Sequence, residues 1–211
     1  MRSLCSLVCV SGVLALTGAA SADVIQFTSD SMASTENLGS FEGSLDYNPA
    51  QQKLTITITN TSPVANGGFL TGLAFRIGSS DAAASAILVT GPVNFQNLGP
   101  AEAPPFGHFV AGAALDADWT GGGQPSRGLG VGQTGVFEFN VTASDGAALE
   151  ALDFIDVANH PGPDMVVRFR GFADGGSDKV PARPDEVVPA PAGVAVLSAA
   201  GLLVATRRRR R

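Results

Sequence analysis

Cysteine is almost absent from this chain. The 211-residue sequence has only Cys5 and Cys9, and both lie near its beginning. Residues 10 to 211 therefore offer no disulfide bond, no thiol nucleophile and no thiolate ligand for a metal. A single domain of the remaining length can still bury a sizeable core without such crosslinks.

Histidine, tryptophan and tyrosine are also scarce. His108 and His160 are the only histidines, and they lack the spacing of a metal-binding pair. Trp119 and Tyr47 are the only residues of their types, so aromatic platforms for stacking sugar rings are few. The sequence has no Gly-x-Ser-x-Gly motif, and its glycine-rich stretch 121–132 lacks the lysine of a phosphate-binding loop. These absences favour a protein without enzymatic activity, metal or cofactor.

Basic residues are few between the two ends of the chain. Residues 23–186 hold all 19 acidic residues but only seven basic ones, which give this segment a formal charge of about −12 against −6 for the whole chain. The seven are Lys53, Arg76, Arg127, Arg168, Arg170, Lys179 and Arg183. This acidity argues against nucleic acid or an anionic membrane as a partner of the segment.

The first 22 residues have the pattern of a secretory signal peptide. Arg2 supplies the positive charge, residues 4–16 are apolar, and Ala20-Ser21-Ala22 presents small residues to signal peptidase. Cleavage between Ala22 and Asp23 is therefore expected. Both cysteines leave with the peptide, so the mature chain has none.

The last 24 residues, 188–211, combine a short motif, an apolar run and a basic end. The motif is Val188, Pro189, Ala190 and Pro191, and the run covers residues 192–206. Those 15 residues would form a helix of roughly 22 Å, short for a bilayer core of about 30 Å. Basic residues that reach the headgroups help such a helix to span and keep its end in the cytoplasm. Here they are Arg207, Arg208, Arg209, Arg210 and Arg211.

Together, the two ends resemble the PEP-CTERM proteins of bacteria with an outer membrane. The family's tails usually read Val-Pro-Glu-Pro before the helix, and here Ala190 stands in the position of the glutamate. The resemblance implies processing by an exosortase near residues 188–191 and export to the cell surface or the extracellular matrix. It covers only the ends of the chain. A permanent single-span anchor without a sorting step is the alternative.

The body, residues 23–180, reads as one all-β domain. Residues 41–47 and 53–59 alternate polar and apolar side chains with the period of a strand, and residues 48–52 join them as a hairpin. Further strands are expected at 24–27, 69–77, 86–90, 136–141 and 166–170. Only residues 147–153 hint at a helical turn. About seven short strands with Gly- and Pro-rich turns predict a single β-sandwich, close to a jelly roll.

Three further segments are expected to be loops, a linker and a turn. Residues 94–132 are poor in strand signals and rich in proline and glycine, so we expect long loops that carry any binding site. Residues 181–187 are expected to be an extended linker to the tail. The turn from Asp174 to Asp178 is expected to be an ordinary surface turn; its two carboxylates make calcium binding the alternative.

The sequence thus predicts an exported, non-enzymatic surface or matrix protein that is processed by signal peptidase and exosortase. An extracellular polysaccharide-binding module, or an enzyme acting on glycans, is the rival prediction. A glycosidase needs two carboxylates that flank a sugar cleft. Exposed aromatic side chains would favour the rival, and burial of Trp119 would weaken it.

Overall fold

The described part of the chain is all-β, as the sequence predicts. The computed structural model describes residues 24–121 and 123–185. The predicted signal peptide and the cleavage site at Ala22 and Asp23 lie outside these residues, as does the predicted tail. The strands are β1 (Val24–Ser29), β2 (Phe41–Asn48), β3 (Lys53–Asn60), β4 (Gly67–Phe75), β5 (Ser85–Thr90), β6 (Phe95–Leu98), β7 (Ala101–Glu102), β8 (His108–Phe109), β9 (Ala111–Leu115), β10 (Thr134–Thr142), β11 (Met165–Phe172) and β12 (Ser177–Pro184).

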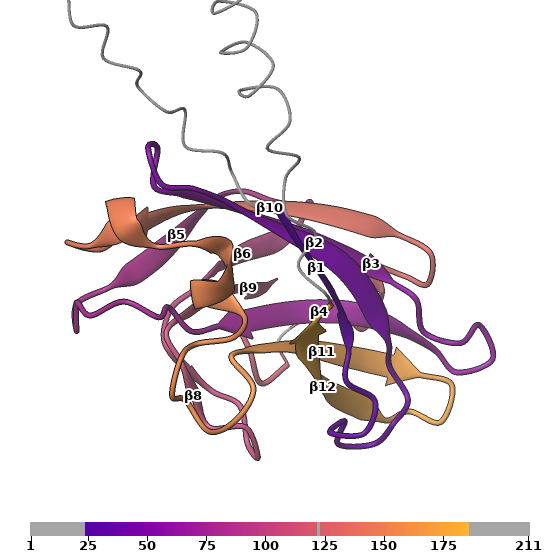
Figure 1. Ribbon diagram of the computed structural model, residues 1–211. Helices are drawn as coiled ribbons and strands as arrows, with labels where there is room; N and C mark the ends of the chain where they lie inside the picture. Colours follow the sequence, from indigo (N-terminus) through magenta and orange to yellow (C-terminus); the bar gives the residue numbers. More distant parts are fainter. Residues whose placement is uncertain (1–23, 122, 186–211) are drawn as a thin grey trace, which may run out of the picture.

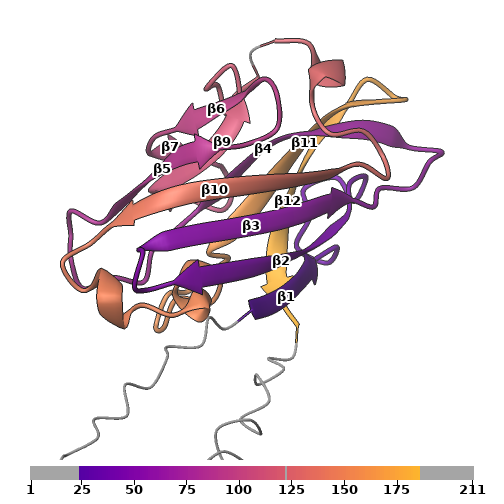
Figure 2. The same cartoon turned by 90° about the horizontal axis from the view of Figure 1, so that it is seen from above.

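Ten of these strands form one antiparallel sheet that folds over on itself. Their order is β5-β10-β3-β2-β1-β12-β11-β4-β9-β6, and β7 pairs with β8 alone. The sheet nearly closes, because its first strand, β5, also contacts β6 and β9 at the other end. Figures 1 and 2 show β10, β3, β2 and β1 as one layer, with β4, β11 and β12 in the layer opposite.

The two layers remain joined along one side. Strands β1 and β12 pair antiparallel, with Phe27 opposite Pro184 and Ser29 opposite Ala182. The sequence predicted a sandwich, and the continuous ladder at this junction makes the two layers parts of a single sheet. Pairing also protects the backbone groups of β1 and β12 that would otherwise form free sheet edges.

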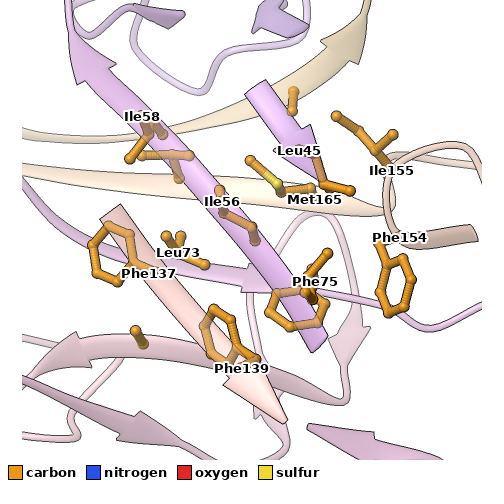
Figure 3. Packing of buried hydrophobic residues seen from close by; sticks show 14 of the residues in the cluster. Leu45, Ile56, Ile58, Leu73, Phe75, Phe137, Phe139, Phe154, Ile155 and Met165 are labelled. Atoms are coloured by element: carbon orange, nitrogen blue, oxygen red, sulfur yellow. The ribbon is translucent and has the colours of Figure 1, made fainter. Parts of the chain in front are cut away.

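The core lies between the layers and follows from the alternation of the strands. In β3, Leu54, Ile56 and Ile58 are fully buried, while the threonines between them face outward. Aromatic pairs join opposite layers: Phe75 lies 5.0 Å from Phe139, and Phe95 lies 5.1 Å from Phe137. Figure 3 shows Phe75, Phe137 and Phe139 among the buried side chains of this core. Such edge-to-face pairs add about 0.5–1.5 kcal/mol each beyond their buried area.

The prediction of long loops over residues 94–132 is wrong for residues 95–115, which hold four strands, and is confirmed for residues 116–132, which hold no named strand. The segment holds β6, β7, β8 and β9 and a short 3₁₀ helix, η1 (Pro125–Arg127). All five residues of β9, Ala-Gly-Ala-Ala-Leu, are buried, because β9 is covered on both faces. A strand covered on both faces has no polar alternation, so the period-two signal is missing.

The predicted linker at residues 181–187 begins too early. Strand β12 continues to Pro184, so the sheet extends beyond residue 180. Proline lacks the N–H donor but keeps its acceptor, and Asp30 N donates to Pro181 O at 2.8 Å. The hint of helix at 147–153 corresponds to two 3₁₀ turns, η2 (Gly146–Ala148) and η3 (Ala151–Phe154).

Candidate functional site

A groove of about 460 Å³ lies on the outer face of β1, β2 and β3. Strand alternation builds it, because every second residue of these strands faces away from the core. Cross-strand register then lines up Gln26 with Ser44 and Ser44 with Thr57. The groove is lined by Gln26, Phe27, Thr28, Glu42, Gly43, Ser44, Thr57, Thr59 and Asp185.

The groove is lined mainly by side chains that form hydrogen bonds. Its outward side chains carry hydroxyl, amide and carboxylate groups, and Thr28 Oγ1 donates to Asp185 Oδ1 at 3.1 Å. Phe27 contributes little to the opening, because it is only 1% exposed and points into the core. The lining holds no histidine, lysine or arginine. The groove thus presents hydrogen-bond donors and acceptors suited to a polar ligand, and its lining has no histidine or lysine to activate a hydroxyl group.

The side chains expected to stack on a sugar are buried. Trp119 is 4% exposed and Tyr47 is 1% exposed. Trp119 packs in a small second cluster outside β4, β9 and β11, together with Phe109 and Val166. Tyr47 donates its hydroxyl to Gly146 O at 2.7 Å, and burial raises its pKa, assisted by the charges of Asp145 and Asp153. Both residues therefore have structural roles.

Asp178, half of the proposed calcium turn, is a buried anchor for the loop before β2. Its carboxylate is 1% exposed and accepts hydrogen bonds from two hydroxyls and three backbone N–H groups at 2.8–3.0 Å. The donors are Ser34, Thr35, Glu36, Leu38 and Gly39. Burial by itself would raise the pKa of Asp178, but these hydrogen bonds outweigh burial and lower it.

Asp174, the other half of that turn, is exposed and accepts only the N–H of Gly176, at 2.7 Å. Its partner carboxylate is already surrounded by donors, which repel a cation rather than share it. Among the described residues, no group of three or more His, Asp or Glu side chains is placed to hold a metal ion.

Sequence reasoning missed a charged cluster at the end of β4. Asp164 is 3% exposed, and its Oδ1 lies 2.8 Å from His160 Nδ1 and 3.5 Å from Arg76 Nε. The Arg76 guanidinium lies 4.7 Å above the Phe109 ring. Burial raises the pKa of Asp164, against the opposing effects of the Val157 N–H, His160 and Arg76. Only the four-residue spacing of His160 and Asp164 was visible beforehand, and it does not identify Arg76.

The other histidine also has a carboxylate partner. His108 Nδ1 lies 2.9 Å from Glu102 Oε1 across the small β7-β8 pair, where both side chains are more than half exposed. The sequence predicted exposed histidines in loops without a metal-binding partner. In the structure, His108 belongs to a short strand, and its contact is a surface ion pair when the ring is protonated, of a kind that contributes little stability.

The predicted sorting signal lies outside the described residues: its motif Val188, Pro189, Ala190 and Pro191 and its basic end, Arg207 to Arg211. In the described ranges, no helix is long and apolar enough to cross a membrane.

No known protein family, curated protein or solved structure matches the chain. The functional argument therefore rests on the residues of the chain itself.

Proposed function

We propose that this chain is an exported, non-enzymatic protein of the cell surface or extracellular matrix, addressed by its C-terminal sorting signal. The observation that carries the proposal is the position of the two ends of the sheet. Strands β1 and β12 pair antiparallel, and Asp185 N donates to Gln26 O at 2.8 Å. The chain therefore enters and leaves the domain at the same pole.

This arrangement suits a domain that is tethered at one point. Val188 follows Asp185 by three residues, which span at most about 11 Å when extended. The sorting motif therefore follows the sheet almost directly. Until processing, the pole of the β1 start and the β12 end faces the membrane, while the other pole faces outward.

The described side chains support a role without catalysis. Trp119 and Tyr47 are used in packing, Asp178 holds a loop, and the outer groove offers only hydrogen-bonding groups. We describe the domain as a jelly-roll-like sandwich whose two layers stay joined at β1 and β12, a scaffold suited to display and binding. Signal peptidase and exosortase are its processing partners.

Two variants of the tail test the proposed sorting signal. Replacing Pro189 and Pro191 by alanine should leave membrane insertion intact, because prolines in a first helical turn contribute little to burial. It should block exosortase processing, so that the protein stays in the membrane fraction. Deleting residues 207–211 should impair retention and orientation before processing. Surface release that is unchanged in the double-proline variant would show that no processing enzyme reads the two prolines, and a wild type that keeps its tail would leave a plain membrane anchor as the explanation.

The groove supports a second candidate function, binding of a neutral polysaccharide by hydrogen bonds. Thr57 and Ser44 line it from adjacent positions of β3 and β2, so the variant Thr57→Tyr should fill the groove and abolish such binding. Calorimetric titration of the wild type with neutral polysaccharides tests this directly. Binding that survives in Thr57→Tyr would remove the groove from consideration.

A further inference from the structure

Four exposed valine and isoleucine side chains lie on and next to the two strands at one end of the sheet. Val136 on β10, and Ile87 and Val89 on β5, are each about half exposed. Val93, in the turn after β5, is almost fully exposed. We call these four residues the aliphatic patch. Single exposed aliphatic side chains are ordinary on a protein surface, but a group of them marks a binding site.

A row of outward side chains connects the groove to this patch. Gln26 lies opposite Ser44, and Ser44 lies opposite Thr57. Thr57 in turn lies opposite Val136 on β10. The first three residues line the groove, and the row crosses β1, β2, β3 and β10, which lie side by side (Figure 2). Adjacent strands are about 4.8 Å apart, so the row extends for roughly 14 Å. A ligand that fills the groove across the strands therefore reaches the patch at Val136.

The charges of the groove select against anionic ligands. Its charged side chains, Glu42 and Asp185, are both acidic. The nearby cation Lys53, on the same strand as Thr57, is paired with Glu138 at 3.1 Å. Carboxylates repel a polyanion, but they accept strong hydrogen bonds from hydroxyl groups. The ligand that fits this lining is therefore neutral and rich in hydroxyl groups.

The patch presents methyl groups and no aromatic ring. Because Trp119 and Tyr47 are buried, neither offers the flat face on which a sugar ring stacks. Valine and isoleucine side chains instead contact small apolar groups. On a neutral polysaccharide, the apolar groups that project from the chain are methyl groups, carried by O-acetyl esters or by 6-deoxy sugars. Burial of one such group corresponds to about a fourfold gain in affinity.

The strands beneath the patch are fixed by the core. Phe137, which follows Val136, is fully buried and packs edge-to-face against Phe95. On β5, the N–H of Leu88 donates to Asn97 Oδ1 at 2.8 Å, which ties this strand to β6. The patch is therefore formed before a ligand binds, and little conformational entropy has to be lost on binding.

We propose that the groove and the aliphatic patch together bind a neutral polysaccharide that carries methyl-terminated substituents, either O-acetyl groups or the methyl groups of 6-deoxy sugars. The proposal rests on the second candidate function, polysaccharide binding in the groove, and adds the substituent that is recognised. Gln26, Ser44 and Thr57 hold hydroxyl groups of the polysaccharide by hydrogen bonds. Val136 contacts the methyl group and determines the specificity.

Ligands that differ in their substituents test the proposal. The full-length protein, in non-ionic detergent, is titrated calorimetrically with O-acetylated glucomannan and with the same glucomannan after alkaline deacetylation. A neutral rhamnan supplies the methyl groups of a 6-deoxy sugar. The wild type should bind the acetylated glucomannan or the rhamnan about fourfold or more tightly than the deacetylated form. The preferred ligand identifies the source of the methyl group.

The variant Val136→Thr isolates the contact with the methyl group, because threonine has nearly the shape of valine and replaces one methyl group by a hydroxyl group. Its affinities for substituted and unsubstituted ligands should differ by less than about twofold, with binding of the unsubstituted ligand unchanged. Val64→Thr is the matched control. Val64 is an exposed valine in the loop after β3, outside the groove lining and the patch, so this variant should keep the wild-type preference. Circular dichroism verifies that both variants are folded.

Separate outcomes distinguish this proposal from the groove function on which it rests. Equal wild-type affinity for substituted and unsubstituted ligands, with binding abolished by Thr57→Tyr, would overturn the proposal and leave the groove function standing. A preference that persists in Val136→Thr would also overturn it. Absence of binding to all three polysaccharides would overturn both. Binding of neutral lipid vesicles or of a second copy through Val136, in place of a polysaccharide, would assign the patch to another occupant and overturn the proposal.

Discussion

Single carboxylates fasten the loops of this domain to its sheet. Asp178, on β12, receives donors from the loop 34–39, and Asp145 receives those of Ser79 and Ser80. Each joins segments that are distant in sequence. A residue type that suggests a metal site in the sequence is thus used as a structural acceptor, and the distinction depends on the donors brought to it by the fold.

Replacing Asp178 by asparagine should destabilise the domain by about 1–3 kcal/mol. The amide group would present N–H donors to backbone N–H donors, and a buried donor without an acceptor costs about 1–3 kcal/mol. Urea unfolding of the variant measures this loss. Asp174→Asn is the matched control, because Asp174 is exposed and asparagine forms the same turn. Equal unfolding midpoints for the two variants would contradict the anchoring role.

The contribution of Asp178 should depend on pH in one direction. Its folded pKa lies below its ordinary value, so the ionised form is favoured by folding. The contribution is complete above the unfolded pKa of about 3.9 and is lost as pH falls through the folded value. The stability difference between the wild type and Asp178→Asn should therefore be constant near pH 7 and shrink below about pH 4. A stability difference that grows on acidification would show that folding raises the pKa of Asp178 rather than lowering it.

Trp119 provides a direct optical test of the sugar-binding alternative. It is the only tryptophan and it is buried beneath the segment that carries β7 and β8. We expect its fluorescence to be blue-shifted in the folded protein and unchanged by polysaccharides. A spectral shift on adding a polysaccharide would show that Trp119 contacts or senses the ligand, contrary to its structural role.

At the scale of elements, strands were predictable where one face is buried and the other is exposed to solvent. The polar and apolar alternation of β3 and β10 indicated both the strands and their core-facing residues. The same rule failed for β9, which is buried on both faces, and for β12, whose prolines indicated a linker. The groove could not be predicted, because it depends on which strands lie side by side. The predicted hairpin of residues 41–59 is confirmed and brings Thr57 opposite Ser44, but the sequence could not place Gln26 of β1 beside Ser44.

The end of β12 should matter for stability. A chain of residues 24–185 should unfold cooperatively, whereas residues 24–180 should be clearly less stable. The shorter chain loses buried Ala182 and the pairing of Pro184 with Phe27, which closes β1 against β12. Thermal unfolding followed by circular dichroism compares the two. Equal melting temperatures would restore the linker prediction for residues 181–185.

At the scale of the whole molecule, the fold places both ends of the described chain at one pole. The predicted signal peptide and the predicted tail would therefore both extend from this pole, and neither would have to cross the surface of the domain. The close spacing of Asp185 and Val188 in the sequence also means that the proposed processing would take place next to folded structure. Inserting a flexible spacer after Asp185 should therefore preserve or increase processing, as measured by the ratio of released to membrane-bound protein, and a loss of processing would show that the enzyme reads the domain itself.

The most direct test of the proposed export and sorting is the intact mass of the protein recovered from the cell surface or medium. Our account predicts a chain that begins at Asp23 and ends near residues 188–191, without the apolar run and the five arginines. In the variant with Pro189→Ala and Pro191→Ala, the mass should include the complete tail. A surface protein that retains residues 192–211 in the wild type would contradict sorting, and one that retains Met1 would contradict cleavage by signal peptidase.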